Sequence, residues 1–236
     1  EDGDGGEVTW NHSIAAHYTG KGLFDQFIGG KDTWLLGASW QMERPLNDHI
    51  RSVSFRQNGV HTLGEKIVDT TISNISSYHY GGPQFQYSNG RYYLSTEYYW
   101  ITGERRDGYT VYDDYSAEGG SIYGQYFFNS DATVKISSKK GKIGGVKCKA
   151  KFGCTAAKFM LESIDTRDGE LNGLNGTHGK AVHIGLNHYF NSNVRLMVDA
   201  TRGVYLGGHN DFYSDGNRAD RRHTMTSIQA RLHAKF

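Results

Sequence analysis

The chain has 236 residues, of which 37% are hydrophobic and 22% charged, and its formal net charge is +1. No stretch approaches the roughly 20 apolar residues of a membrane helix, which excludes a helical membrane protein. The near-zero net charge excludes a global bias toward nucleic acid or anionic membranes. With 16 Tyr and only 2 Pro, the composition favours strands, because proline interrupts the hydrogen bonds between them.

Alternation of apolar and polar residues predicts strands along the chain, at 34–43, 92–100, 122–128, 182–190 and 194–201. Asn- and Ser-rich triplets predict tight turns at 88–90, 129–131 and 191–193, and polar stretches predict long loops at 103–117, 167–179 and 207–223. Short turns at one end and long loops at the other are typical of outer-membrane barrels, with the turns in the periplasm.

Two segments alternate poorly, and each either adds strands or folds inward as a loop. The first, 49–74, carries Arg51 and Arg56. The second, 131–152, carries Lys135, Lys139, Lys140, Lys142, Lys147, Lys149 and Lys151. Lysines at an aqueous mouth would concentrate anions, whereas a solvated loop is the alternative. The run lacks interleaved aromatic residues and does not suit nucleic acid.

Two cysteines, Cys148 and Cys154, lie in this second segment or next to it. In one straight strand they would be about 20 Å apart, too far for a disulfide. A bridge therefore requires a turn at 150–153, and an oxidising envelope permits one. Their spacing and the missing partner ligands do not match a zinc site, and none of the histidines recurs at metal-ligand spacing.

The last segment, 224–236, separates most clearly into two faces. Alternate residues from Thr226 to Phe236 are mostly apolar, and those between them include Arg231 and Lys235. A strand of this kind, ending on an aromatic residue, closes an outer-membrane barrel with lipid outside and water inside. The fold prediction is an all-β, transmembrane, antiparallel up-and-down β-barrel of roughly 10–12 strands, forming one domain over residues 1–236. The first residues hold no signal peptide, so we expect an exported chain in its mature or trimmed form.

Cations on predicted inward positions are expected to face water, because a charge on the lipid face costs about 2–4 kcal/mol near the midplane. They are Lys158, Arg195, Arg231 and Lys235. They either contact a solute or pair with the inward carboxylates Glu97, Glu162 and Asp199. These cations and the lysine run predict a basic lumen.

The stretch GLNHYFNSNVRLMVDA, 185–200, resembles the strand–turn–strand signature G-L-N-W-Y-x-N-P-N-V-R-L-M of the phosphate-selective porin O/P family. Ser192 stands where proline is usual and His188 where tryptophan is usual. GGPQFQY, YYLSTEYYW and GGSIYGQYFF are also similar and occur in the family's order, so the resemblance spans 33–236.

The resemblance implies a homotrimeric porin, usually of sixteen strands, with inward loops whose arginines and lysines pass anions. This chain is too short for sixteen strands, so we expect the missing strands to precede its first residue. The family's inward loop carries closely spaced arginines, and here Ser54, Asn58 and Gly59 stand where arginine or proline is usual.

The predicted function is passive diffusion of small hydrophilic solutes across the bacterial outer membrane, with a preference for anions. The alternative is a non-conducting structural or adhesive barrel whose loops contact a host or lipopolysaccharide. No serine is marked as an activated nucleophile, so an enzyme is not predicted, and neither is a cofactor or metal. The expected partners are small anions, the lipid bilayer and lipopolysaccharide.

Overall fold

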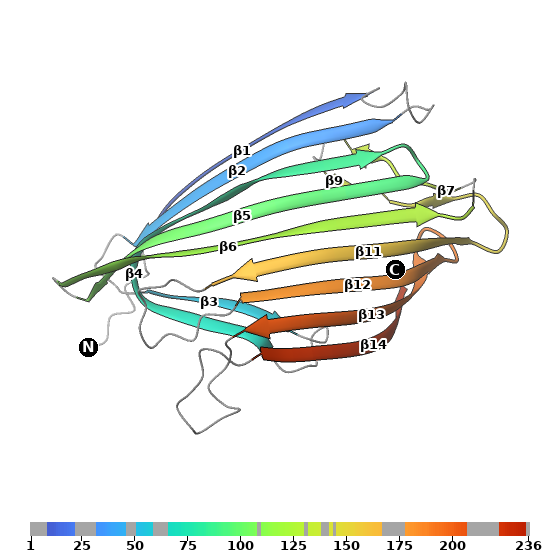
Figure 1. Ribbon diagram of the computed structural model, residues 1–236. Helices are drawn as coiled ribbons and strands as arrows, with labels where there is room; N and C mark the ends of the chain where they lie inside the picture. Colours follow the sequence, from blue (N-terminus) through green and yellow to red (C-terminus); the bar gives the residue numbers. More distant parts are fainter. Residues whose placement is uncertain are drawn as a thin grey trace, which may run out of the picture.

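The computed structural model describes residues 9–21, 32–45, 51–58, 66–107, 110–129, 132–137, 142–143, 145–166, 178–206 and 222–234. These residues form fourteen β-strands (Figure 1). No helix among them is long and apolar enough to cross a membrane.

Nine long strands form an antiparallel sheet in which each strand pairs with the next in the order given. They are β1 (Thr9–Lys21), β2 (Thr33–Pro45), β4 (Lys66–Ser88), β5 (Tyr92–Asp107), β6 (Thr110–Phe127), β11 (Cys154–Asp165), β12 (His178–Tyr189), β13 (Val194–Leu206) and β14 (Arg222–Ala234). Strand β3 (Arg51–Asn58) is the tenth member and pairs with the first part of β4. That part of β4 bends away from the line of the other strands (Figure 1).

Four two-residue strands lie outside this sheet. β7 (Ala132–Thr133) pairs with β10 (Lys147–Cys148), and β8 (Ile136–Ser137) pairs with β9 (Lys142–Ile143). Within the described ranges β1, β3 and β14 each pair with one strand, so the sheet is not closed by the described pairings. That the last strand closes the barrel therefore stays a prediction.

The strands meet their connections at two ends of the sheet. At one, the turn end, residues 89–91 join β4 to β5 and residues 190–193 join β12 to β13. At the other, the loop end, residues 166–177 join β11 to β12 and residues 207–221 join β13 to β14. The predicted alternation of short and long connections is present at these four places.

The stretches predicted as strands lie in β2, β5, β6, β12, β13 and β14 to within one residue, with 235–236 outside the described residues. The predicted loop at 103–117 is wrong, because β5 and β6 stay paired as far as Asp107 and Thr110. Thr110, Val111 and Tyr112 are β-branched or aromatic and favour strands. Backbone ladder bonds do not require an apolar face, so polar side chains did not end the pairing.

The segment after β6 also differs from the prediction. The predicted tight turn at 129–131 does not join two neighbouring wall strands, because residues 128–153 separate β6 from β11. The prediction of added wall strands in this segment is wrong, and the alternative, inward folding, is confirmed. The physical reason is burial: Ala132, Val134 and Ile136 pack against the wall.

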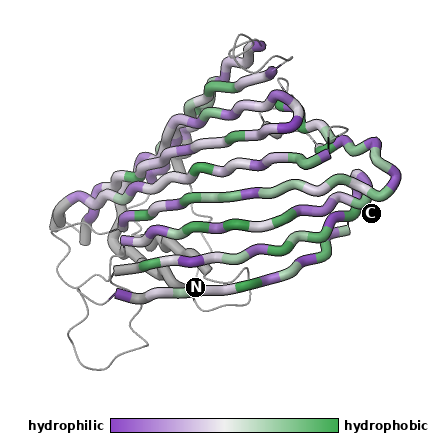
Figure 2. Tube along the Cα trace, turned by 45° about the vertical axis from the view of Figure 1, so that its right-hand side comes forward, coloured by the Kyte–Doolittle hydropathy of each residue, from purple (hydrophilic) through white to green (hydrophobic). Residues whose placement is uncertain are grey.

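Cross-strand pairing places most apolar side chains on one face of the sheet, the outer face. Ile228 of β14 lies beside Ala200 of β13, which lies beside Ile184 of β12. Many of these side chains are exposed, with Ile228 at 79% and Leu232 at 67%. Figure 2 shows hydrophobic and hydrophilic residues alternating along the strands. Membrane hydrocarbon accounts for such an apolar surface, which water would oppose.

The opposite, inner face is mostly polar and packs the 128–153 segment at the turn end. The buried side chains there form one cluster. They are Leu35, Tyr93, Phe127, Ala132, Val134, Ile136, Cys154, Ala156 and Tyr189. The most closely packed apolar part of the described structure is thus inside the curve of the sheet at one of its ends.

Candidate functional site on the inner face

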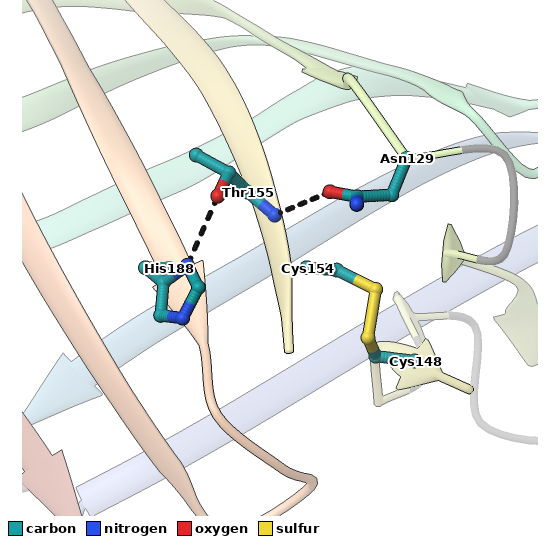
Figure 3. Close-up of a disulfide and its surroundings, with 5 residues drawn as sticks. All are labelled: Asn129, Cys148, Cys154, Thr155 and His188. Atoms are coloured by element: carbon teal, nitrogen blue, oxygen red, sulfur yellow. Dashed lines mark hydrogen bonds between the residues drawn. A yellow bond between two sulfur atoms is a disulfide. The ribbon is translucent and has the colours of Figure 1, made fainter. Parts of the chain in front are cut away.

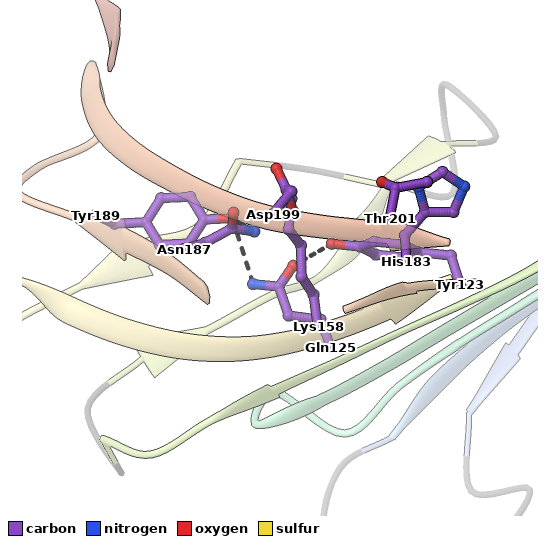
Figure 4. Close-up of polar contacts among 8 residues, drawn as sticks. All are labelled: Tyr123, Gln125, Lys158, His183, Asn187, Tyr189, Asp199 and Thr201. Carbon is purple, nitrogen blue, oxygen red and sulfur yellow. Dashed lines mark hydrogen bonds and ion pairs between the residues drawn. The ribbon is translucent and has the colours of Figure 1, made fainter. Parts of the chain in front are cut away.

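Lys158 of β11 and Asp199 of β13 form an ion pair across β12. The register places Gly185 of β12 beside both. Because Gly185 has no side chain, the Lys158 ammonium reaches Asp199 Oδ1 at 2.5 Å (Figure 4). A Cβ at Gly185 would lie 2.4 Å from that oxygen. Glycine at this position therefore permits the pair, which neutralises Lys158.

A chain of hydrogen bonds lies beside this pair and extends to Tyr189 at the turn end (Figure 4). Tyr123 Oη donates to Gln125 Oε1 at 2.7 Å, and Gln125 Nε2 donates to Tyr189 Oη at 3.3 Å. Asn187 Nδ2 donates to the same oxygen at 3.4 Å. The bonds join β6 to β12 across β11, where Ala156 is small. Such a network holds its side chains in fixed positions.

Toward the loop end, His183 of β12 lies between two polar neighbours. Its Nδ1 is 2.8 Å from Thr201 Oγ1, and its Nε2 is 3.1 Å from Glu162 Oε1. The Thr201 hydroxyl and His183 Nδ1 share a hydrogen bond, whereas Nε2 lies close to Glu162 without forming a hydrogen bond among the described residues. This level of the inner face therefore holds a close contact between His183 and Glu162.

Arg195 of β13 has no carboxylate partner among the described residues. Its Nε is buried and has no hydrogen-bond partner there. The register places it between Tyr189 and His233. It faces a cavity of about 590 Å³ between the wall and the inward segment. The lining of that cavity includes Glu97, Tyr123, Gly145, Val146 and His233. A guanidinium that lines a cavity without a countercharge among the described residues suits an anion from solution.

The 128–153 segment is attached to the turn end of the wall by hydrogen bonds. Val134 N donates to Gly90 O at 2.9 Å, and Ser88 Oγ donates to Val134 O at 2.6 Å. Val134 and Ile136 are buried while Lys135 between them is exposed. The alternation that buries the apolar side chains thus directs this lysine toward solvent.

A disulfide joins Cys148 of this segment to Cys154 at the start of β11 (Figure 3), with the two Cα atoms 5.8 Å apart. The turn that the bridge requires is present, since Gly153 N donates to Ala150 O at 3.0 Å. Gly153 has φ of +89°, a backbone conformation that favours glycine. Lys147 and Lys149, on either side of Cys148, are exposed.

The structure describes the remaining predicted cations in less detail. Arg231 is exposed on the inner face of β14, opposite Met197. Arg51 and Arg56 are on β3 and Lys142 is on β9, and only their backbone is described. Lys139 and Lys140 lie outside the described residues. The structure therefore brings Lys158 and Arg195 together on one wall, with the exposed Lys135 and Lys147 on the segment packed against it.

The other side chains of this site are not cations predicted from the sequence. They are Tyr123, Gln125, His183, Asn187, Tyr189 and His233. Alternation along each strand indicates that these side chains face inward. It does not indicate the register between strands that brings them together. In the part of the chain that the structure describes, no group of three or more His, Cys, Asp or Glu side chains could hold a metal ion.

Comparison with known protein families gives a match. The model of the phosphate-selective porin O and P family matches residues 58–236. The matched part contains the whole inner-face site and the 128–153 segment. No curated protein matches the chain.

Proposed function

The chain belongs to the phosphate-selective porin O and P family of bacterial outer-membrane porins, and on that premise we propose that it is a passive channel for small hydrophilic solutes that prefers anions. The observation that carries the anion preference is Arg195. It faces the 590 Å³ cavity without a carboxylate partner in the described structure, whereas Lys158 is neutralised by Asp199.

In this proposal an anion exchanges part of its hydration shell for donors of the wall. The guanidinium of Arg195 supplies charge, and the exposed Lys135 and Lys147 raise the local anion concentration. Binding stays weak enough for release because Glu97 lines the same cavity.

The other predicted contacts belong to the same proposal and await a test. They are Arg51, Arg56, Lys139, Lys140, Lys142, Lys158 and Arg231. A homotrimer, in a membrane that carries lipopolysaccharide, is the assembly that we propose from the family.

The test is a planar bilayer with a salt gradient, in which the reversal potential reports anion preference. We expect single-channel steps at low voltage and a reversal potential of anionic sign. Arg195→Gln should shift that potential toward cations. Arg202→Gln is the matched control, because Arg202 is on the same strand but its register position is on the outer face, and it should leave the potential unchanged.

Two outcomes would count against the proposal. A chain that folds and inserts but gives no open-channel steps would favour the non-conducting structural or adhesive barrel. A conducting chain whose reversal potential is cationic, or is equally altered by both substitutions, would refute the role of Arg195.

A further inference from the structure

The outer face carries an apolar groove across β5, β6, β11, β12, β13 and β14. Its volume is about 760 Å³. The groove forms where outward positions hold small residues, namely Gly124, Ala157 and Ala200, among larger neighbours. Phe159 lies over Gly124, so closely that a Cβ there would be 2.1 Å from the ring. The larger lining residues include Leu94, Phe159, Ile184, Leu186 and Ile228.

A cation stands at the turn end of this groove. Tyr92 and Tyr126 line the groove, with ring centroids 4.8 Å apart. The Arg91 guanidinium carbon lies 5.2 Å from the Tyr126 centroid, and Nη2 donates to Tyr126 Oη at 2.8 Å. Its other acceptors are the carbonyls of Phe127 and Phe128. These are neutral, and no carboxylate of the described residues pairs with Arg91, so its charge is uncompensated there.

The surroundings of Arg91 match the level of a lipid headgroup. Tyr92, Phe128 and Phe190 are exposed at the turn end, at 48%, 53% and 49%. Tyrosine and other aromatic residues gather where a barrel meets the membrane–water interface. Arg91 Nε and Nη2 already donate to protein acceptors, so Nη1 is the group left to donate a charge-assisted hydrogen bond to a phosphate. A cation at the interface and an apolar groove leading into the hydrocarbon together fit one amphiphilic anion.

A second copy of the chain fits this site less well. Outer-face carboxylates of the described strands, among them Glu118 and Asp165, are at the loop end. Copies inserted in one orientation keep their turn ends at the same membrane surface. None of these carboxylates can therefore reach Arg91 of a neighbour.

We propose that a phospholipid of the periplasmic leaflet binds here, with an acyl chain in the groove and its phosphate on Arg91. The turn end faces the periplasm in barrels of this kind, which selects the phospholipid leaflet over the lipopolysaccharide leaflet. The site does not depend on conduction, so the lipid-binding proposal and the channel proposal can each be refuted without affecting the other.

The test is native mass spectrometry of the folded protein after reconstitution with phosphatidylglycerol. The unmodified protein should retain a phospholipid. Arg91→Gln should weaken retention about tenfold, whereas Arg91→Lys, which keeps the charge, should weaken it less. Ala200→Phe should fill the groove and abolish retention. The controls are Ala38→Phe, an outward alanine on β2, and Arg202→Gln, an outward cation at the loop end, and both should retain lipid.

A second measurement uses unmodified protein and so avoids any folding defect. Phosphatidylglycerol with a photoreactive acyl chain should label peptides from β6, β11 and β13. The proposal is overturned if labelling is spread evenly over the outer face, or if folded Arg91→Gln and Ala200→Phe both retain lipid normally. Retention of lipid A in place of phospholipid would overturn it as well. The proposal would also be overturned if a second copy of the chain bound at this site and Ala200→Phe abolished that binding.

Discussion

At the scale of single residues, the net positive charge that an inward cation presents to the lumen depends on its neighbour across the strands. Lys158 and Arg195 are both inward cations, yet Lys158 contacts Asp199 at 2.5 Å and Arg195 contacts no carboxylate of the described part. The difference depends on Gly185, which leaves space for the ion pair. Counting inward cations therefore overstates the positive charge that a solute meets.

Asp199→Asn should increase anion preference, because it leaves Lys158 without its countercharge. Lys158→Gln should lower anion preference by exposing Asp199. Each single substitution should also lower the free energy of unfolding by about 1–3 kcal/mol, between the values for exposed and buried pairs. Reversal potentials and urea titrations measure the two effects.

The double variant is the control for this pair, since it removes both charges and should restore a reversal potential close to that of the unmodified chain. Equal potentials in all four proteins would show that the Lys158–Asp199 pair does not face the permeating solute.

At the scale of elements, residues 128–153 determine how the turn end of the lumen is shaped. Three apolar side chains anchor the segment to the inner face, while Lys135, Lys147 and Lys149 are exposed. The lysine-rich composition predicted a segment near water but left strands and inward folding open. The sequence could not decide between them because the buried partners, Leu35 and Tyr93, are distant along the chain.

Removing the bridge with Cys148→Ser/Cys154→Ser should loosen this segment without unfolding the sheet. A closed loop this short contributes about 2 kcal/mol by restricting the unconstrained chain. We expect faster proteolysis within 132–153 and noisier open-channel current. The matched control is reductant, which should act on the unmodified channel and not on the serine variant. Identical digestion rates for both oxidised proteins would contradict a tethering role.

At the scale of the whole molecule, two asymmetries underlie the orientation that we expect for the protein in its membrane. By strand register and side-chain exposure, one face of the sheet is apolar and exposed, and the other is polar and partly covered. The turn end carries the short turns at 89–91 and 190–193 but also the longer connection at 22–32, and the loop end carries the long connections at 166–177 and 207–221 but also the short one at 108–109. In outer-membrane barrels the end with short turns faces the periplasm.

Cysteine labelling on intact cells tests this orientation. A polymer-linked maleimide too large to permeate should label Arg222→Cys at the loop end. It should label Asn193→Cys at the turn end only after the cells are permeabilised. Both positions are exposed, and the native cysteines are joined in a disulfide. Labelling of Asn193→Cys on intact cells would reverse the assignment.

The sequence by itself determined the stretches in β2, β5, β6, β12, β13 and β14, their two faces and the family, because period-2 alternation records which side chains meet lipid and which meet water. It also located the cysteine turn and the cation-rich segment. Only the tertiary structure decided which cations are neutralised, where the segment after β6 packs, and that β5 and β6 continue through the predicted loop. These outcomes depend on register across neighbouring strands, and contacts between residues far apart in the chain leave no periodic signal in it.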